Sequence, residues 1–302
     1  MIDVCLLGTG GTVPLPDRWL TSLLVKWNGK SILVDCGEGT QIALSQQRKS
    51  PKEIDTILLT HYHADHTAGL PGLLLTMAKS ERTEPVTIYG PKGLEEILQG
   101  VFIIARYVPF EIRYKEIRNR EESFMIDDMK ITAFALQHSV PCFGYSFELA
   151  RQPKFDVQRA LKLDLPKMFW GRLQKGETVE YEGKVYTPDM VLGDPRKGIK
   201  LVYATDTRPV PYIESHAVNA DLLIAEGMYG DPEKIENAKE NRHMMMQECA
   251  SIAAKANVHE LWFTHYSPSM HDPWQYEEEL KGIFHNCIIA KDGQNKDLAF
   301  QE

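Results

Sequence analysis

The feature that most constrains this chain is the segment Thr60-His61-Tyr62-His63-Ala64-Asp65-His66-Thr67, which gathers three imidazoles and one carboxylate within six residues. Side chains share a helix face at intervals of three or four residues and a strand face at intervals of two. The spacing of these four groups matches neither period, so we expect a loop. Imidazole nitrogen and carboxylate oxygen are ligands of zinc and similar ions in catalytic sites, so the loop is a candidate metal site.

The residues on either side of this loop predict a strand before it and a helix after it. Residues 54–59 are rich in β-branched and leucine side chains, which favours a buried strand, and Gly69 to Leu74 open a helix. The candidate ligands would then follow the carboxyl end of a strand, where a rigid scaffold presents functional loops.

Three further candidates also follow predicted strands, namely His138, Asp206 and His265. A lone histidine in such a place is usually structural, but a loop with three histidines needs more ligands, which makes His138 a candidate. A carboxylate at a strand end, such as Asp206, is well placed to bridge two ions. The Thr-His-Tyr at residues 264–266 repeats that at 60–62, which indicates a duplicated half-domain with ligands converging between two sheets.

Two other polar residues have open roles. Asp35 ends a predicted strand and is either a ligand or a group that orients a ligand histidine. Asn241 is expected to cap a helix that runs to Ala256, which would put His243 in the first helical turn. A helix N-terminus favours the neutral imidazole over its cation.

Composition places the chain among soluble globular α/β proteins. It has 302 residues, of which 43% are apolar, and we expect one domain over residues 1–302. Five scattered cysteines without CxxC spacing argue for reduced thiols and a cytoplasmic location. We expect neither a membrane nor DNA as a partner, because no apolar run could span a bilayer and the net charge is −8.

One segment departs from this acidic character. Residues Arg151 to Lys200 hold 11 lysines and arginines against 7 acidic residues, and they interrupt the alternation of predicted strands and helices. We predict an inserted arm or lid over residues 150–197, with a short helical stretch near Asp156 to Leu163, a hairpin-like run from Glu177 to Tyr186 and otherwise little structure of its own. Its basic charge is either a solvated loop surface or a contact for a polyanion.

The histidine loop is similar to the HxHxDH signature of the metallo-β-lactamase superfamily. Its continuation in residues 69–74 and four further segments resemble the ribonuclease Z family of tRNA 3′-processing endonucleases. Those segments are Leu7-Gly8-Thr9-Gly10, Asp35-Cys36-Gly37-Glu38-Gly39-Thr40, Asp206-Thr207-Arg208-Pro209 and Thr264-His265-Tyr266-Ser267-Pro268. The resemblance extends from Leu6 to Pro268 and implies a four-layer αββα sandwich of two mixed sheets flanked by helices.

Carried over residue by residue, the resemblance implies two divalent metal ions per subunit, with zinc first and manganese or iron as alternatives. One ion would be held by His61, His63 and His138, and the other by Asp65, His66 and His265, with Asp206 bridging them. Asp65 resembles the family's proton acceptor and His243 its proton-shuttling histidine. The expected reaction is removal of the 3′ trailer from a tRNA precursor by metal-bound hydroxide, in a homodimer whose arm grips the tRNA.

A second function stays open at this stage. The arm lacks the Gly-Pro dipeptide typical of the family, and Ala225-Glu226-Gly227-Met228 replaces the family's His-Glu-Ala-Thr segment. The same metal chemistry would serve a hydrolase of small phosphodiesters or other esters, of the cyclic nucleotide phosphodiesterase or lactonase type. Glu226 is retained, so a contact between Glu226 and His243 remains an expectation.

Overall fold

The computed structural model describes residues 1–301, which fold into two compact units. The main unit comprises Met1–Glu148 and Ile199–Ala299, and the inserted unit comprises Leu149–Gly198 with the last residues of the chain. Among the described residues, no helix has the length and apolar character that crossing a bilayer requires.

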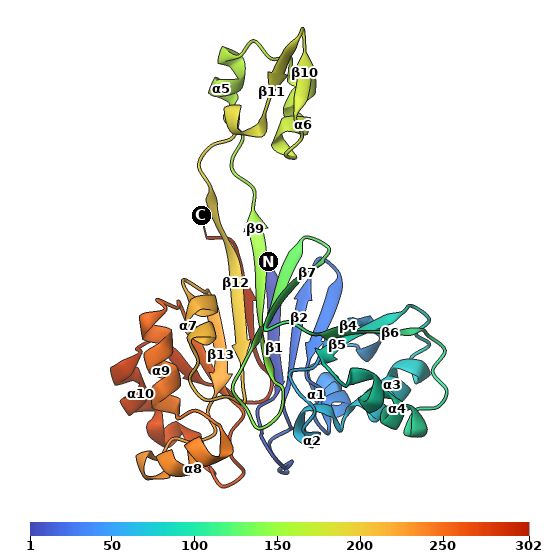
Figure 1. The fold of residues 1–302 in the computed structure, drawn as a ribbon, viewed down its shortest axis with the longest axis vertical. Helices are drawn as coiled ribbons and strands as arrows, with labels where there is room; N and C mark the ends of the chain where they lie inside the picture. Colours follow the sequence, from blue (N-terminus) through green and yellow to red (C-terminus); the bar gives the residue numbers. More distant parts are fainter. Residues whose placement is uncertain (302) are drawn as a thin grey trace. The chain divides into compact units, whose positions relative to one another are not determined.

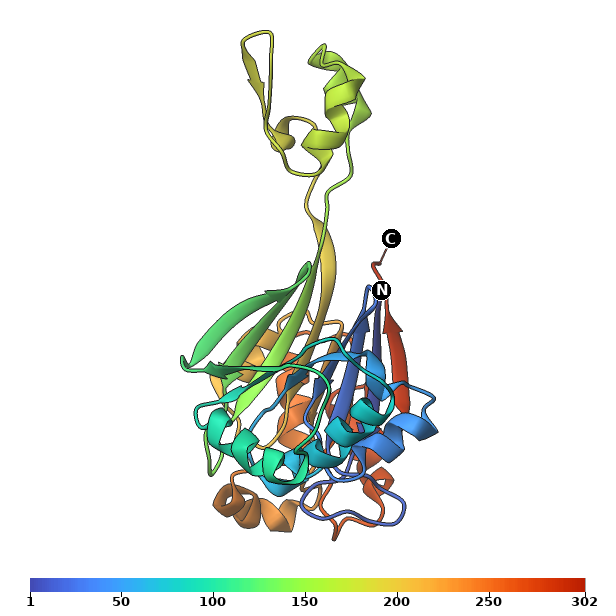
Figure 2. The same ribbon diagram turned by 90° about the vertical axis from the view of Figure 1, so that its right-hand side faces the viewer.

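The first sheet of the main unit combines the N-terminal strands with the last strand of the chain. Its order is β16-β1-β2-β3-β4-β5-β6, and β16 pairs with β1 in antiparallel fashion, so that the red last strand lies beside the blue first strands in Figure 2. From β3 onward the pairs are parallel. The strands are β1 (Ile2–Gly8), β2 (Ser22–Trp27), β3 (Lys30–Val34), β4 (Ile54–Leu58), β5 (Val86–Pro91), β6 (Ile112–Ile117) and β16 (Gln294–Leu298).

The second sheet has the order β15-β14-β13-β12-β9-β8-β7. Its strands β12 to β15 pair in parallel, whereas β7 and β8 form an antiparallel pair. The strands are β7 (Glu121–Ile126), β8 (Met129–Ala135), β9 (Phe143–Arg151), β12 (Arg196–Ala204), β13 (Leu222–Glu226), β14 (Leu261–Thr264) and β15 (Cys287–Ile289). Two mixed sheets therefore make up the inner layers of this unit.

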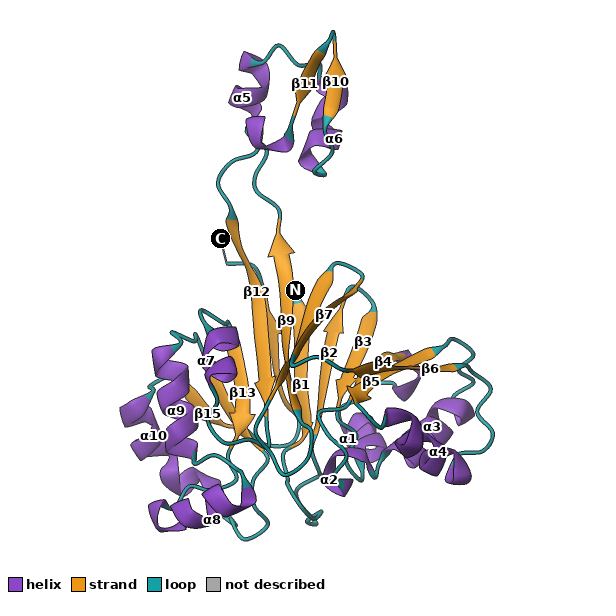
Figure 3. Ribbon diagram, viewed as in Figure 1, coloured by secondary structure: helices purple, strands orange, loops and turns teal. Residues whose placement is uncertain are grey.

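Helices cover the outer face of each sheet, because alternate strand residues point outward and need apolar partners. Leu33 and Ile57 pack with α1, α3 and α4, and Leu223 and Phe263 pack with α7, α9 and α10. The helices lie outside the sheets on both sides in Figures 1 and 3. Their bounds are α1 (Thr40–Gln46), α2 (Ala64–Thr67), α3 (Leu70–Lys79), α4 (Leu94–Ile104), α7 (Pro211–Ala217), α8 (Ile235–Asn241), α9 (Met246–Lys255) and α10 (Glu277–Ile283). The expected αββα sandwich is confirmed.

The single helix expected from Asn241 to Ala256 is wrong. Asn241 is the last residue of α8, and Arg242 follows it with a left-handed backbone at φ 59°. A second helix, α9, then begins at Met246. His243 therefore lies in the connection between two helices and not in a first helical turn.

The inserted unit contains the expected short helix and hairpin, and it adds a second helix and a small core that were not predicted. It contains α5 (Val157–Lys162), α6 (Trp170–Gln174) and a hairpin of β10 (Val179–Tyr181) and β11 (Lys184–Tyr186). The hairpin turns at Gly183, whose φ of 71° suits a residue without a Cβ. These elements share a small core of buried side chains: Ala160, Leu165, Leu173, Val179, Tyr186 and Val191. The spacing of apolar residues in this segment follows neither the helix period nor the strand period, so the sequence did not predict this core.

Candidate metal centre

The histidine loop follows β4, and it is only partly a loop. His61 and His63 precede the short helix α2, whereas Asp65 and His66 belong to it, and the backbone of His63 is extended. The expectation of a loop throughout was therefore wrong for Asp65 and His66. The helix begins only after His63 because His63 has an extended backbone, with ψ 153°, and α2 itself is a single turn from Ala64 to Thr67.

Three polar residues that end strands have left-handed backbones, which residues other than glycine adopt at a cost. Asp35 after β3, Asp206 after β12 and His265 after β14 have φ values of 59°, 54° and 56°. Such a conformation costs about 1–2 kcal/mol per residue and is typical of functional sites. Each turn directs its side chain to the region between the two sheets, where all three side chains are buried.

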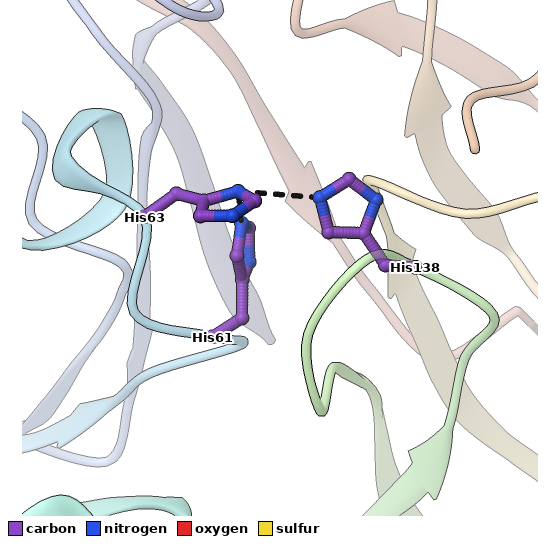
Figure 4. Close-up of side chains that lie close together, drawn as sticks. All are labelled: His61, His63 and His138. Atoms are coloured by element: carbon purple, nitrogen blue, oxygen red, sulfur yellow. Dashed lines mark hydrogen bonds between the residues drawn. The ribbon is translucent and has the colours of Figure 1, made fainter. Parts of the chain in front are cut away.

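His61, His63 and His138 form the first group of nitrogen donors. His63 Nδ1 lies 3.0 Å from His61 Nε2 and 3.2 Å from His138 Nε2. Figure 4 shows the three rings converging, with His138 approaching from a separate loop. Two zinc–nitrogen bonds of about 2.0–2.1 Å at a tetrahedral angle would put the nitrogens about 3.3 Å apart, so this spacing fits an ion.

Asp65, His66 and His265 form the second group. His265 Nε2 lies 3.3 Å from both His66 Nε2 and Asp65 Oδ2. Asp206 lies between the groups: its Oδ1 is 3.3 Å from His66 Nε2, and its Oδ2 is 3.9 Å from the Nε2 atoms of His61 and His138. The structure thus brings together all seven residues that the sequence singled out as candidate ligands, in sets whose donor atoms lie within 4.8 Å of one another.

The hydrogen bonds around Asp35 show which group needs a cation. The Asp35 carboxylate accepts from His66 Nδ1 at 2.8 Å and from the amide of Thr60 at 2.8 Å, so it orients a histidine instead of joining the donor sets. A neutral His66 then presents its Nε2 lone pair to the carboxylates of Asp65 and Asp206. Because this lone pair faces two carboxylates, a cation or an additional proton must lie between His66 Nε2 and these oxygens. In agreement, Asp206 Oδ1 is buried without a hydrogen-bond partner among the described residues.

The pKa shifts of the histidines differ between the first and the second donor group. Burial lowers the pKa values of His61, His63 and His138, which keeps these imidazoles neutral, the form that binds metal. Burial disfavours the charged form of His66 as well, but the carboxylates of Asp206 and Asp35 raise its pKa well above the ordinary value. The most acidic part of the cluster is therefore its Asp65–Asp206 side, where a cation is most strongly attracted.

His243 is paired with Glu226, as the sequence suggested. His243 Nδ1 lies 2.7 Å from Glu226 Oε2, and Glu226 Oε1 accepts from the amides of Thr207 and Met244. Burial lowers the pKa of His243, but the charge and hydrogen bond of Glu226 outweigh this effect and raise that pKa to about 9. The effect expected of a helix N-terminus on this imidazole does not apply, because a buried carboxylate faces the ring.

An open cavity of about 830 Å³ gives access to this cluster. His63, Asp65, His138, His243 and His265 lie in its wall, and its outer rim includes Tyr229, Asn241 and Ser267. A substrate can therefore reach these donor groups through the cavity, as a catalytic centre that binds its substrate directly requires.

The sequence did not single out several contacts that hold the site together. The amide of Thr12 donates to Asp65 Oδ2 at 2.7 Å from a left-handed backbone at φ 70°. Arg242 donates to the carbonyl of His138, and Arg208 donates to the carbonyl of His243. The resemblance covered the glycine-rich segment just before Thr12, but nothing in the sequence pattern marked the two arginines.

Two packed sheets with histidine and aspartate donors at the ends of their strands define the metal-dependent hydrolases of the metallo-β-lactamase fold. Comparisons with known proteins agree. The chain is 51% identical to ribonuclease Z of Agathobacter rectalis and 50% identical to that of Lachnoclostridium phytofermentans, in both cases over 100% of its own length and 100% and 99% of theirs. The chain belongs to the ribonuclease Z family.

Two further comparisons concern the fold. The crystal structure of the short form of human tRNase Z matches 99% of this chain and 100% of its own with a TM-score of 0.71 and 24% identity. The family model described as "Anti-Pycsar protein Apyc1" matches residues 2–155, which include the histidine loop and His138.

Proposed function

We propose that this protein is an endoribonuclease that removes the 3′ trailer from tRNA precursors with the help of two divalent ions. The observation that carries the proposal is the pair of donor groups joined by Asp206, in a chain half identical to named ribonucleases Z. His61, His63 and His138 would hold one ion, and Asp65, His66 and His265 the other, with Asp206 shared. Zinc is the first candidate for both.

The bound ions would supply Lewis acidity and activate water for an in-line displacement at phosphorus. The residues of the chain then have defined tasks. Asp65 accepts a proton from the attacking water, because hydrogen bonds from the Thr12 amide and His265 hold its carboxylate in place. Burial raises the pKa of Asp65, but the hydrogen bond of His265 and the charges of His66 and His265 outweigh burial and lower that pKa, which keeps the carboxylate ionised before it accepts the proton. His243 donates a proton to the departing 3′-oxygen, because Glu226 keeps its imidazole charged and oriented.

The inserted unit is the proposed exosite for the tRNA body. Its basic residues include Lys154, Lys162, Lys167 and Lys175, all largely exposed. Exposed cations contribute sequence-independent affinity for phosphates, which suits contacts away from the scissile bond.

A homodimer in the cytoplasm is the proposed working form. Ile103, Ile104 and Tyr107, at and just beyond the end of α4, are 67%, 67% and 87% exposed, an apolar surface that a second copy would cover. All five cysteines are free and buried, as expected in a reducing compartment.

The test compares cleavage of a 3′-extended tRNA precursor with that of bis-p-nitrophenyl phosphate. We expect the wild type to cut both, Asp65→Ala to cut neither at a comparable rate, and a variant lacking residues 151–197 to retain activity on the small ester alone. Cleavage of the small ester without any cleavage of the precursor would refute the assignment of tRNA as substrate.

A further inference from the structure

A second groove, of about 600 Å³, lies beside the metal centre. It shares His138 and Ser139 with the cavity over the cluster, and it continues away from them between the loop 135–141, Arg120 and the start of α7. Val140, Pro141, Val210 and Tyr212 supply apolar surface. A ligand that reaches phosphorus at the metal centre can therefore extend directly into this groove.

The groove also holds a cation without a partner. Arg120 is exposed, and in the described part of the chain no carboxylate lies within 4.0 Å of its guanidinium, whereas nearby Arg118 and Arg113 are paired with Glu116 and Glu111. Arg120 and Tyr212 line the same groove, so the groove combines a charge for phosphate with an aromatic side chain for a base. This combination is typical of sites for single-stranded nucleic acid.

The chemistry fixes which part of the RNA belongs here. Hydrolysis that leaves a 3′-hydroxyl on the tRNA breaks the bond from phosphorus to the 3′-oxygen, and the water oxygen stays with the trailer as part of its 5′-phosphate. The 3′-oxygen must face the proton donor His243, which lines the first cavity but not the groove. The tRNA side of the scissile bond thus occupies the first cavity, and the groove remains for the trailer.

We propose that the groove of Arg120, Gln137 and Tyr212 binds the first nucleotides of the single-stranded 3′ trailer. Arg120 contacts a trailer phosphate, and Tyr212 stacks on a trailer base. This inference rests on the proposed function, since it takes its direction along the RNA from the role of His243. It predicts that the enzyme senses the length of the trailer and not only the scissile bond.

The test measures binding of a 5′-phosphorylated, fluorescent RNA pentamer to the metal-loaded enzyme by anisotropy. Tyr212→Ala should raise the Kd at least about fivefold, because it removes base stacking. Arg120→Gln should also raise the Kd at least about fivefold, because it removes a charge-assisted contact to phosphate. Arg118→Gln serves as the matched control and should bind as the wild type does. Tyr212→Phe keeps the ring and should also bind normally, which separates stacking from any loss of stability in Tyr212→Ala.

Cleavage of precursors with trailers of one and six nucleotides completes the test. Arg120→Gln should lower kcat/KM for the long trailer at least about fivefold and leave the short one unchanged. Unchanged pentamer affinity in Arg120→Gln and Tyr212→Ala would overturn the groove assignment even if precursors are cut. If the wild type cuts no precursor, yet the variants bind the pentamer weakly, the proposed function fails and the groove stands as a site for single-stranded RNA.

Discussion

Replacing Glu226 by glutamine should separate proton donation from the rest of the catalytic machinery. Glu226 is completely buried, and its Oε1 is held by the amides of Thr207 and Met244. A glutamine would keep its oxygen on these amides and turn its NH₂ group toward His243 Nδ1. That nitrogen would then have to accept a hydrogen bond, and the imidazole would lose the negative partner that favours its cation.

The size of the effect follows from the pKa of His243. With a pKa of about 9 this side chain is almost entirely protonated at pH 7.5, whereas an imidazole with the ordinary pKa of 6.5 would be protonated in roughly one molecule in ten. The loss of orientation adds to this, and general acids contribute about 10²- to 10⁴-fold to rates. We expect kcat on the tRNA precursor to fall about 10²-fold at pH 7.5.

The assay compares two leaving groups over a range of pH. Bis-p-nitrophenyl phosphate releases a stable anion that needs no proton, so Glu226→Gln should cleave it nearly as fast as the wild type. On the precursor, activity requires the protonated donor and is lost as the pH rises through its pKa. Because the substitution lowers that pKa, the basic limb should move to lower pH. Equal losses on both substrates with an unmoved limb, at full metal content, would refute the role of Glu226 as partner of a proton donor.

Three further outcomes are expected. Asp35→Asn should weaken metal binding about 10- to 100-fold, because it removes the carboxylate that orients His66. Calorimetric titration with the metal ion measures this affinity, and an affinity equal to that of the wild type would contradict the prediction. Gly11→Ala should also weaken metal binding, since a Cβ there would lie 2.8 Å from Cε1 and Nε2 of His265, whereas Gly100→Ala, which meets open space in α4, should retain it. Chelation should abolish cleavage of both substrates and lower the melting temperature, with both restored by zinc; an unchanged melting temperature would show that no ion supports the fold.

The sequence revealed the fold and the donor set because both depend on local signals. Strands β4 and β12 become apolar toward their carboxyl ends, at Ile57–Leu58 and Leu201–Ala204. Histidine or aspartate follows each of these ends, so the topology brings the donors together. Strands β6 and β7 were not predicted, because half of the residues in each are exposed and neither strand is a continuous apolar run.

Two features could not be predicted from the sequence: an unusual backbone conformation at Arg242 and the small core of the inserted unit. The left-handed Arg242 separates α8 from α9, and an arginine is not a residue that predicts such a break. The small core of the inserted unit was also missed, because its buried residues, among them Leu173 and Tyr186, come from elements of three to six residues. Periodicity cannot be measured over such short elements.

The division of the donors between the two sheets has a consequence for synthesis. His61 to His66 follow β4, but Asp206 and His265 follow β12 and β14, so the proposed donor set is complete only after 265 of 302 residues have been made. A nascent chain whose later strands are absent already holds His61 to His66 and His138, but it lacks Asp206 and His265. Hydrolytic activity toward RNA therefore begins only after β14 and His265 have been made, and the surrounding ribosomal and transfer RNA is not exposed to a half-made nuclease.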